Sequence, residues 1–285
     1  MILSFHPCFD ADIQMILGDQ VLGPDHAEKI EGADAIILPQ ACTQNLYEAC
    51  ARSEASVFPN YAARIQYPGK MGQHRLFEAF RLRCPRTYAW SSADHFKAEW
   101  ERSNKLPHSF PFLFKEDRRH EGEGIFFVEN PSGLRGALTQ LEIREKSGAS
   151  GFVSQDYVAC EGNALRVVIV GDRVITYWKR PRDPQQSITT ISRGARIDHQ
   201  WKPALQQKGE IQARRLSAQA GINLAAVDFI FPDNDPDFEP LFLEINYYFG
   251  RRGLGGSETY YRLLYEVIRE WLNGCGLAPD AVRLV

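Results

Sequence analysis

Two acids and an amide lie in two short apolar stretches late in the chain. Asp228 is within Ala225–Phe231, and Glu244 is within Leu241–Ile245, two residues before Asn246. Because side chains alternate along a strand, Glu244 and Asn246 share one face. Carboxylates among apolar residues are costly to bury alone, and Mg²⁺ binds such hard oxygen ligands. We therefore expect a metal site at Asp228, Glu244 and Asn246, with a hairpin of solvent-facing acids as the alternative.

The residues between these stretches form a turn by composition. Residues 232–236 read Pro-Asp-Asn-Asp-Pro, and such residues do not extend a strand ladder but hydrogen-bond their own backbone. Each flanking stretch has the length of a strand. The segment predicts an antiparallel hairpin, and the other elements are organised around it.

A second group of residues could bind phosphate. Lys115 lies in the apolar stretch Pro111–Asp117, and a loop with Gly122 and Gly124 leads to a second strand over Ile125–Val128. A lysine beside a Gly-x-Gly turn can place an ammonium and backbone N–H groups over phosphate oxygens. A hairpin turn needs glycine in any case, so the lysine and the glycines together carry this interpretation.

Basic residues recur at other predicted elements. Lys70 precedes the helix predicted over Met71–Leu82, where a cation gains nothing from the helix dipole. The residues alone therefore favour a surface role for Lys70. Arg166, Lys179 and Arg180 bracket a predicted hairpin, as three solvated cations or as a cluster that faces anionic substrate groups.

Composition excludes several classes of protein. The 285 residues are 44% hydrophobic and 24% charged with a net charge of −3, so nothing global indicates a nucleic-acid or membrane partner. No apolar stretch is long enough to span a bilayer, and no basic leader precedes the first apolar residues. The six cysteines form no CxxC pair, which predicts reduced thiols and a cytoplasmic protein.

The first sixty residues predict a small α/β layer. Short apolar strands alternate there with helices, a pattern typical of parallel strands, and Thr43 is placed to cap a helix that ends near Arg52. No glycine-rich dinucleotide fingerprint follows the first strand, so this layer is expected on the substrate side or as a scaffold.

In this order, the parts resemble the ATP-grasp superfamily, and within it the RimK-like and glutathione-synthetase-like carboxylate–amine ligases. The resemblance spans Tyr67–Asn273 and rests on VDFIF, LFLEIN and QDYVACEGNALRVVIVGDRV. It implies an α/β (α+β) ATP-grasp fold. The expected domains are a small N-terminal α/β domain over residues 1–66, a lid over 67–154 and a lobe with an antiparallel sheet over 155–285.

The resemblance also implies roles in nucleotide binding. Lys70 and Lys115 match the lysines that reach the nucleotide phosphates, which reverses the interpretation of Lys70 from the residues alone. Gly122 and Gly124 match the mobile loop over those phosphates, and Glu161 matches the contact to the ribose hydroxyls. The hinge whose backbone reads adenine is matched by Gln155, Asp156, Tyr157 and Val158.

The remaining roles concern the metal and the reacting phosphate. Asp228, Glu244 and Asn246 match ligands of Mg²⁺, with Mn²⁺ as the alternative ion. The positions that meet the γ-phosphate or the acyl phosphate are matched by Arg166, Arg180 and Arg193.

The implied reaction is an ATP-dependent ligation. ATP phosphorylates a small-molecule or peptide carboxylate, and an amine attacks the acyl phosphate. The alternatives are a phosphotransferase on the same fold and a non-catalytic nucleotide- or peptide-binding module. The presence of both lysines and all three metal ligands argues against the module. The oligomeric state stays open, a homo-oligomer included.

The acceptor pocket departs from the family pattern. Residues 247–253 are bulky and basic where relatives commonly run through small residues and a proline, and Ala164 replaces a common acid. Arg251 and Arg252, beside aromatic residues, suggest an anionic substrate with an apolar or aromatic part; a solvated basic loop is the alternative. The substrate cannot be transferred from relatives.

Overall fold

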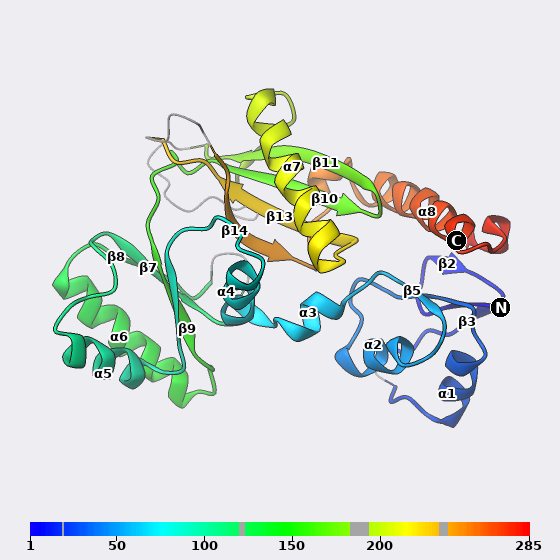
Figure 1. The fold of residues 1–285 in the computed structure, drawn as a ribbon, viewed down its shortest axis with the longest axis horizontal. Helices are drawn as coiled ribbons and strands as arrows, with labels where there is room; N and C mark the ends of the chain where they lie inside the picture. Colours follow the sequence, from blue (N-terminus) through cyan, green and yellow to red (C-terminus); the bar gives the residue numbers. More distant parts are fainter. Residues whose placement is uncertain (19, 120–122, 183–193, 234–238) are drawn as a thin grey trace.

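The structure is a computed structural model that describes residues 1–18, 20–119, 123–182, 194–233 and 239–285 (Figure 1). The three larger sheets of the described residues follow one another across an elongated molecule, with the lid at one end, a five-stranded antiparallel sheet in the middle and the N-terminal layer at the other end. Both chain termini lie at the N-terminal end (Figure 1). Among the helices of the described residues, none is long and apolar enough to cross a bilayer.

The N-terminal layer is a four-stranded sheet of order β3-β1-β4-β5, and all its strands are parallel, as predicted. The predicted cap is also present, because the Thr43 side chain accepts a hydrogen bond from the Leu46 N–H at 3.3 Å. The elements are β1 (Ile2–Ser4), β2 (Phe9–Asp10), β3 (Ile13–Gln14), α1 (Pro24–Glu31), β4 (Ala35–Ile37), α2 (Gln44–Ala51) and β5 (Ser56–Phe58).

Two helices lead from this layer to the lid, α3 (Ala62–Gln66) and α4 (Gly69–Ala79). The lid is an antiparallel sheet of order β6-β9-β7-β8. Its core joins aromatic residues of β7 and β9 to two helices. The lid elements are β6 (Thr87–Trp90), α5 (Ala93–Ser103), β7 (Phe112–Glu116), β8 (Ile125–Val128), α6 (Pro131–Lys146) and β9 (Phe152–Asp156). Because β9 runs to Asp156, it crosses the boundary predicted after residue 154.

The central sheet has the order β12-β11-β10-β13-β14 and is antiparallel throughout. The predicted hairpin is formed by β13 and β14, and Asp228 lies directly opposite Glu244. The elements of this lobe are β10 (Ala164–Val170), β11 (Arg173–Arg180), β12 (Arg196–Asp198), α7 (Pro203–Ala220), β13 (Leu224–Ile230), β14 (Leu241–Asn246), η1 (Arg252–Leu254), α8 (Ser257–Gly274), η2 (Pro279–Ala281) and β15 (Arg283–Leu284).

Alternation along the strands divides the two faces of this sheet. Val167 and its face-mates pack with α7 and α4. Val168 and its face-mates pack with α8 and with the N-terminal layer, in a core shared by both. Arg166 lies two residues before Val168 on β10 and therefore shares its face. Asp228 of β13 is on the same face because it pairs in register with Arg166. The metal-ligand candidates therefore occupy the α8 side of the sheet, beyond the part that α8 covers.

The ends of the chain join the N-terminal layer to the central lobe. β15 pairs with β2 in a two-stranded antiparallel sheet, with Leu284 opposite Phe9. Phe9 also stacks on Tyr265 of α8, with ring centroids 6.3 Å apart. The N-terminal layer and the central lobe therefore form one packed body, which the sequence did not predict.

Candidate active site

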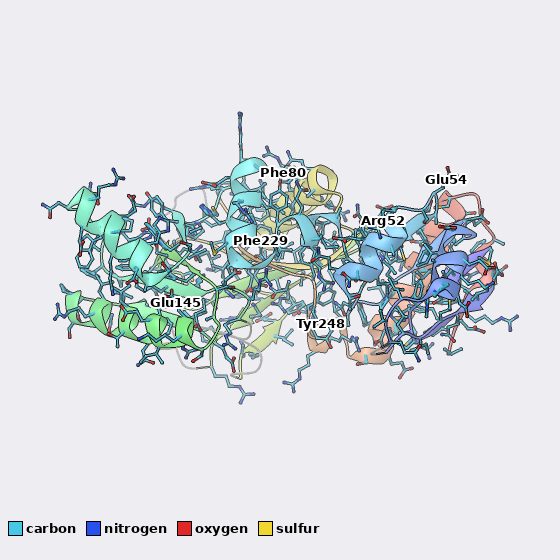
Figure 2. All side chains as sticks on the ribbon, turned by 90° about the horizontal axis from the view of Figure 1, so that it is seen from below. Arg52, Glu54, Phe80, Glu145, Phe229 and Tyr248 are labelled. Atoms are coloured by element: carbon cyan, nitrogen blue, oxygen red, sulfur yellow. The ribbon has the colours of Figure 1, made fainter. Side chains whose placement is uncertain are left out.

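A cavity of about 1160 Å³ lies where the lid, the central sheet and the N-terminal layer meet. Among its lining residues are Lys115 from the lid, Asp228 from the central sheet and Gln40 from the N-terminal layer. Figure 2 shows Tyr248, one of the lining residues, between the part that carries Glu145 and the part that carries Arg52. All three parts of the fold thus contribute to a single site.

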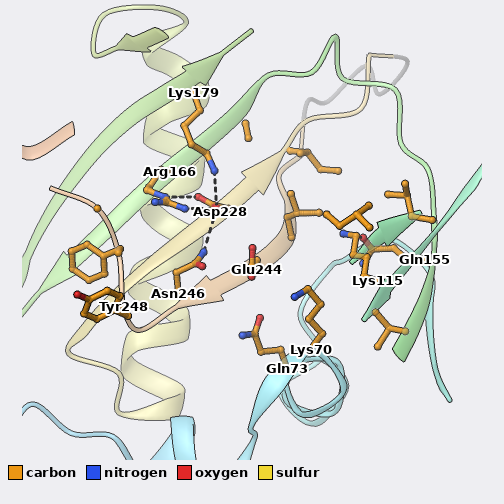
Figure 3. A pocket seen from close by; sticks show the side chains of 18 of the residues that line it. Lys70, Gln73, Lys115, Gln155, Arg166, Lys179, Asp228, Glu244, Asn246 and Tyr248 are labelled. Atoms are coloured by element: carbon orange, nitrogen blue, oxygen red, sulfur yellow. Dashed lines mark hydrogen bonds and ion pairs between the residues drawn. The ribbon is translucent and has the colours of Figure 1, made fainter. Parts of the chain in front are cut away.

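The centre of the cavity is a buried group of charges around Asp228 (Figure 3). The Arg166 guanidinium donates Nε–H to one oxygen of Asp228 at 2.8 Å and Nη2–H to the other at 2.7 Å. Lys179 Nζ donates to the second oxygen at 2.8 Å, and Asn246 Nδ2 lies 3.3 Å from it. Bidentate pairing of this kind fixes both position and orientation.

Asp228 stays ionised in this setting. Burial alone would raise its pKa, but the charges of Arg166 and Lys179 and their hydrogen bonds outweigh burial and lower the pKa to about 2. Burial dominates at Lys179 and lowers its pKa, with Asp228 partly offsetting it. The cluster thus holds two cations on one anion.

The donor set of the predicted metal site fits a hard divalent cation. Glu244 lies opposite Asp228 and has no ion pair within the described part of the chain. Asn246 uses its Nδ2 toward Asp228, which leaves its Oδ1 for another partner. Two carboxylates and an amide oxygen, completed by nucleotide phosphates, are what Mg²⁺ takes in proteins. The described residues contain no cluster of three or more His, Cys, Asp or Glu that could hold a metal without such help.

The two predicted phosphate lysines lie across Glu244 from the Arg166–Asp228 pair (Figure 3). Lys115 is 8% exposed, and its Nζ donates to Gln155 Oε1 at 2.6 Å. Burial lowers the pKa of Lys115 to about 8, although Glu244 opposes this shift. Lys70 reaches from the first turn of α4 and donates to the backbone oxygen of Arg119.

The predicted hinge residues line the cavity together. Gln155 holds Lys115 with its oxygen and donates its Nε2 to Thr87 Oγ1 at 2.9 Å. The Asp156 carboxylate bonds the buried His108 at 2.6 Å, so it is turned toward the lid. Val158 packs with apolar side chains of β13 and β14. The hinge therefore has fixed side chains and an apolar neighbour suited to a planar base.

Not every predicted residue lies on the cavity wall. Glu161 is exposed, and its neighbours Gly162 and Asn163 line the cavity instead. Gly124 is buried behind the wall, where an added Cβ would lie 2.2 Å from the Glu116 carboxylate. Gly122 and Arg193 lie outside the described residues.

The structure separates Arg180 from the other basic residues. Its guanidinium lies 4.1 Å from the ring centroid of Trp201 and donates to Asp198 at 3.0 Å. Lys179, one residue earlier, points to the opposite face and bonds Asp228. Lys179 thus takes the place in the cluster that the sequence analysis gave to Arg180. Alternation along the strand could have predicted this placement. Tyr177 lies opposite Arg166, and Lys179, two residues later, is on the same face of the sheet as Tyr177.

Helix α4 contributes a face that the sequence analysis did not single out. Lys70, Gln73, His74 and Phe77 line the cavity at helical spacing. Gln73 pairs with the backbone of Ile245, donating Nε2 to its oxygen at 2.8 Å and accepting from its N–H at 2.9 Å. This contact uses the free edge of β14 and places Lys70 beside Glu244 (Figure 3).

The end of the cavity beyond Asn246 is aromatic and basic. Tyr248 is 73% exposed there, on the far side of the metal-ligand candidates from Lys115 (Figure 3). Arg251 lies over the rings of Tyr260 and Tyr261, at 5.1 Å and 4.5 Å from their centroids. Arg252 is exposed and also lines the cavity. Arg251 and Arg252 therefore both line this end of the cavity, and their predicted contact with substrate stays a prediction.

Comparisons with known proteins agree with this architecture. A family model described as the RimK-like ATP-grasp domain matches residues 73–261. No curated protein matches the chain in sequence. Several solved structures match it in fold. The ADP complex of an N5-carboxyaminoimidazole ribonucleotide synthetase has a TM-score of 0.58 and 14% identity, over 85% of this chain and 60% of that one.

Two further structures match over most of this chain. A RimK domain ATP-grasp protein from Sphaerobacter thermophilus has a TM-score of 0.55 and 16% identity, over 87% of this chain and 81% of that one. A biotin carboxylase from Campylobacter jejuni, in complex with β,γ-ATP, has a TM-score of 0.58 and 16% identity, over 91% of this chain and 59% of that one. The chain thus spans about three fifths of the synthetase and of the carboxylase.

These matches confirm the predicted fold class and the resemblance on which it rested. The family model covers 189 of the 285 residues, from 73 to 261. The chain therefore belongs to the RimK-like ATP-grasp family.

Proposed function

We propose that the protein is an ATP- and Mg²⁺-dependent ligase that activates a substrate carboxylate as an acyl phosphate and joins it to an amine. The observation that carries this proposal is the charge of the cavity. Seven lysines and arginines line it against three acids, in a chain whose net charge is −3. Such a concentration of cations suits the phosphates of a nucleotide and an anionic intermediate.

The residues divide the work between two sides of Glu244. On the lid side, Lys70 and Lys115 neutralise the nucleotide phosphates, and the backbone of residues 155–158 contacts the base. On the other side, Arg166 and Lys179 face the transferred phosphoryl group and the acyl phosphate. Charge neutralisation and in-line positioning are the main contributions that a protein makes to phosphoryl transfer.

The metal candidates lie between these groups. Asp228, Glu244 and Asn246 would hold Mg²⁺, which would supply positive charge to neutralise the phosphates of the nucleotide. Asp228 has a second role, since it fixes Arg166 and Lys179 in place. Its lowered pKa keeps it an anion throughout the physiological range.

The reaction balances without a protein nucleophile. A carboxylate oxygen attacks the γ-phosphorus and ADP leaves; the amine nitrogen then attacks the acyl carbon, phosphate leaves with the C–O bond electrons, and the amine loses a proton to solvent. The roles required of the protein are binding, orientation and exclusion of water.

The test is phosphate release with panels of carboxylates and amines. A ligase releases ADP and phosphate in equal amounts only when both substrates are present, and mass spectrometry identifies the amide. A phosphotransferase would give ADP and a stable phosphorylated product with no amine requirement. Lys115→Met and Glu244→Gln should abolish turnover. Lys97→Met is the matched control, because Lys97 pairs with Glu142 on the lid surface away from the cavity.

A further inference from the structure

The helix that carries Lys70 begins without a cap of its own. The N-cap residue of α4 is Pro68, which has no side-chain hydrogen-bond acceptor, and no acid lies in the first turn. The first N–H groups of a helix need partners, and the positive end of the helix dipole favours an anion over a cation such as Lys70. The start of α4 therefore needs an acceptor from elsewhere in the chain.

Asp117, the residue that follows β7 of the lid, supplies this acceptor. Its Oδ1 accepts a hydrogen bond from the Met71 N–H at 3.0 Å, and its Oδ2 lies 3.6 Å from Arg118 Nε. The Asp117 side chain is only 7% exposed. It lies against Gly69, where an added Cβ would be 2.3 Å from Oδ1 and where the φ of +67° also favours glycine. A buried carboxylate bonded to a helix N–H group fixes both partners in position, so Asp117 joins the lid to the start of α4.

This contact lies beside both of the predicted phosphate lysines. Lys70 is within the turn that Asp117 contacts, and Lys115 lies two residues before Asp117. Lys70 also donates to the backbone oxygen of Arg119, two residues after Asp117. The two lysines line the same part of the cavity (Figure 3), and burial followed by the charge of Lys70 lowers the pKa of Lys115. Because like charges repel, a fixed contact is needed to hold the two ammonium groups together.

We propose that Asp117 is a positioning residue for nucleotide binding, which holds the start of α4 on the lid and so keeps Lys70 beside Lys115. Asp117 is not among the residues that line the cavity, so it acts through the lysines. One turn later, α4 is bonded to the backbone of β14 through Gln73. With both contacts, α4 sets the spacing between the phosphate lysines and the metal-ligand candidates of β14. This inference rests on the proposed function, in which the two lysines bind phosphate.

The experiment measures affinity by titration calorimetry of the full-length protein with a non-hydrolysable ATP analogue and Mg²⁺. Asp117→Ala removes the acceptor and should weaken binding about tenfold. Asp117→Asn keeps an acceptor oxygen and should bind within about threefold of the wild type. Gly69→Ala reaches the same contact from the other side, because its Cβ would displace the carboxylate. It should weaken binding about as much as Asp117→Ala.

A second set of variants shows whether the effect passes through Lys70. Lys70→Met should weaken binding by itself, and adding Asp117→Ala or Gly69→Ala to it should weaken binding no further. A general disturbance of the lid would instead weaken binding by the same factor in both backgrounds. Asn130→Ala is the matched control. The Asn130 side chain accepts a hydrogen bond from the Gly133 N–H at 3.0 Å at the start of α6, away from the cavity, so its loss should leave the affinity unchanged.

The outcomes separate this inference from the proposed function. A wild type that binds no analogue would overturn the ligase proposal, and the inference with it. Normal wild-type binding that Asp117→Ala and Gly69→Ala both leave unchanged would overturn only the role of Asp117. An equal loss in the Lys70→Met background would also overturn it, because Asp117 would then not act through Lys70. Binding by Asp117→Asn as weak as that by Asp117→Ala would exclude the hydrogen bond to α4 as the cause.

Discussion

At the scale of single residues, burial decides what the charged groups of this site can do. Lys115 and Lys179 are both buried, yet Lys179 bonds a carboxylate, whereas among the described residues Lys115 bonds only the neutral oxygen of Gln155. A buried ammonium without an anion is costly, and a phosphate would remove that cost. Lys115 is therefore the residue whose charge state should respond most to nucleotide.

The first prediction concerns the pH dependence of ATP binding. The pKa of Lys115 is lowered to about 8 in the free protein, so its positive charge is lost as the pH rises through that value. Affinity for Mg²⁺–ATP should be constant below about pH 8 and fall up to tenfold per pH unit above it. Bound phosphate should raise the pKa, so binding above pH 8 takes up a proton. Calorimetry in buffers of different ionisation enthalpy measures both effects.

Two variants test whether the step near pH 8 comes from the charge of Lys115. Lys115→Arg should bind ATP without the step near pH 8, because a guanidinium stays charged. Lys97→Met should keep the step. An affinity that stays constant well into the alkaline range in the wild type would show that the charge of Lys115 is not used.

The second prediction separates Asp228 from Glu244, the two acids that we propose as metal ligands. Asp228→Asn leaves Arg166 and Lys179 buried without an anion, so it should cost about 3–5 kcal/mol of unfolding free energy. Glu244→Gln removes no ion pair and should stay within about 1 kcal/mol of the wild type. Both should lose turnover. Urea denaturation compares the stabilities, and equal losses for the two variants would contradict the account of Asp228.

Asp228 also predicts a pH range for acid instability. Its folded pKa is about 2, below the ordinary 3.8, so the folded state favours the ionised form. This contribution is complete above about pH 4 and is lost as the pH falls toward 2. The stability difference between wild type and Asp228→Asn should therefore shrink over that range.

At the scale of elements, alternation along β11 sorts neighbouring cations. Lys179 and Arg180 are adjacent in sequence, but one bonds Asp228 on the cavity face and the other stacks on Trp201 on the opposite face. The third prediction follows from this difference. Lys179→Met should lower kcat at least a hundredfold, whereas Arg180→Met should change it less than about threefold. Steady-state kinetics at saturating ATP test this, and a large kcat loss for Arg180→Met would show that the far face takes part.

The local sequence pattern predicted most of the helices and strands, but fewer of the contacts between them. The hairpin of β13 and β14 follows from two apolar stretches around a Pro–Asp turn. Helix α5 was not predicted, because only Ala93 and Phe96 are buried on it and no clear periodicity results. Gln40 contacts a residue 207 positions away, which one sequence cannot indicate.

The residues of the candidate site divide in the same way, into those that the sequence indicates and those that only the fold brings to the cavity. Lys115, Asp228, Glu244 and Asn246 stand out because polar groups interrupt apolar strands, and the structure brings them to one cavity. Gln73 and Arg64 lie on helices whose charged and amide residues look like ordinary surface positions. Docking of α4 on the β14 edge turns Gln73 inward. Arg64 of α3 reaches the cavity wall beside the backbone of Gln40.

At the scale of the whole molecule, the packing divides the chain into two bodies. One core contains Phe58 of the N-terminal layer, Val168 of the central sheet and Ile268 of α8, whereas the lid has a core of its own around Phe96 and Phe114. The cavity lies between these bodies. A lid with a separate core can change its position over the nucleotide without repacking the substrate side.

The fourth prediction tests this division with two Phe→Ala variants. Phe9 and Phe114 are both fully buried, so each truncation should cost about 3–5 kcal/mol where its core is cooperative. Because Phe9 packs on α8, Phe9→Ala should lower hydrogen-exchange protection in the N-terminal layer and also in β10 and β13, while β7 stays protected. Phe114→Ala should lower protection in β7 and β9 and leave β10 unchanged. If Phe9→Ala exposed only the N-terminal strands, the shared core would not act as one unit. The N-terminal side of the cavity would then belong to a separately folding domain, not to a wall fixed to the central sheet.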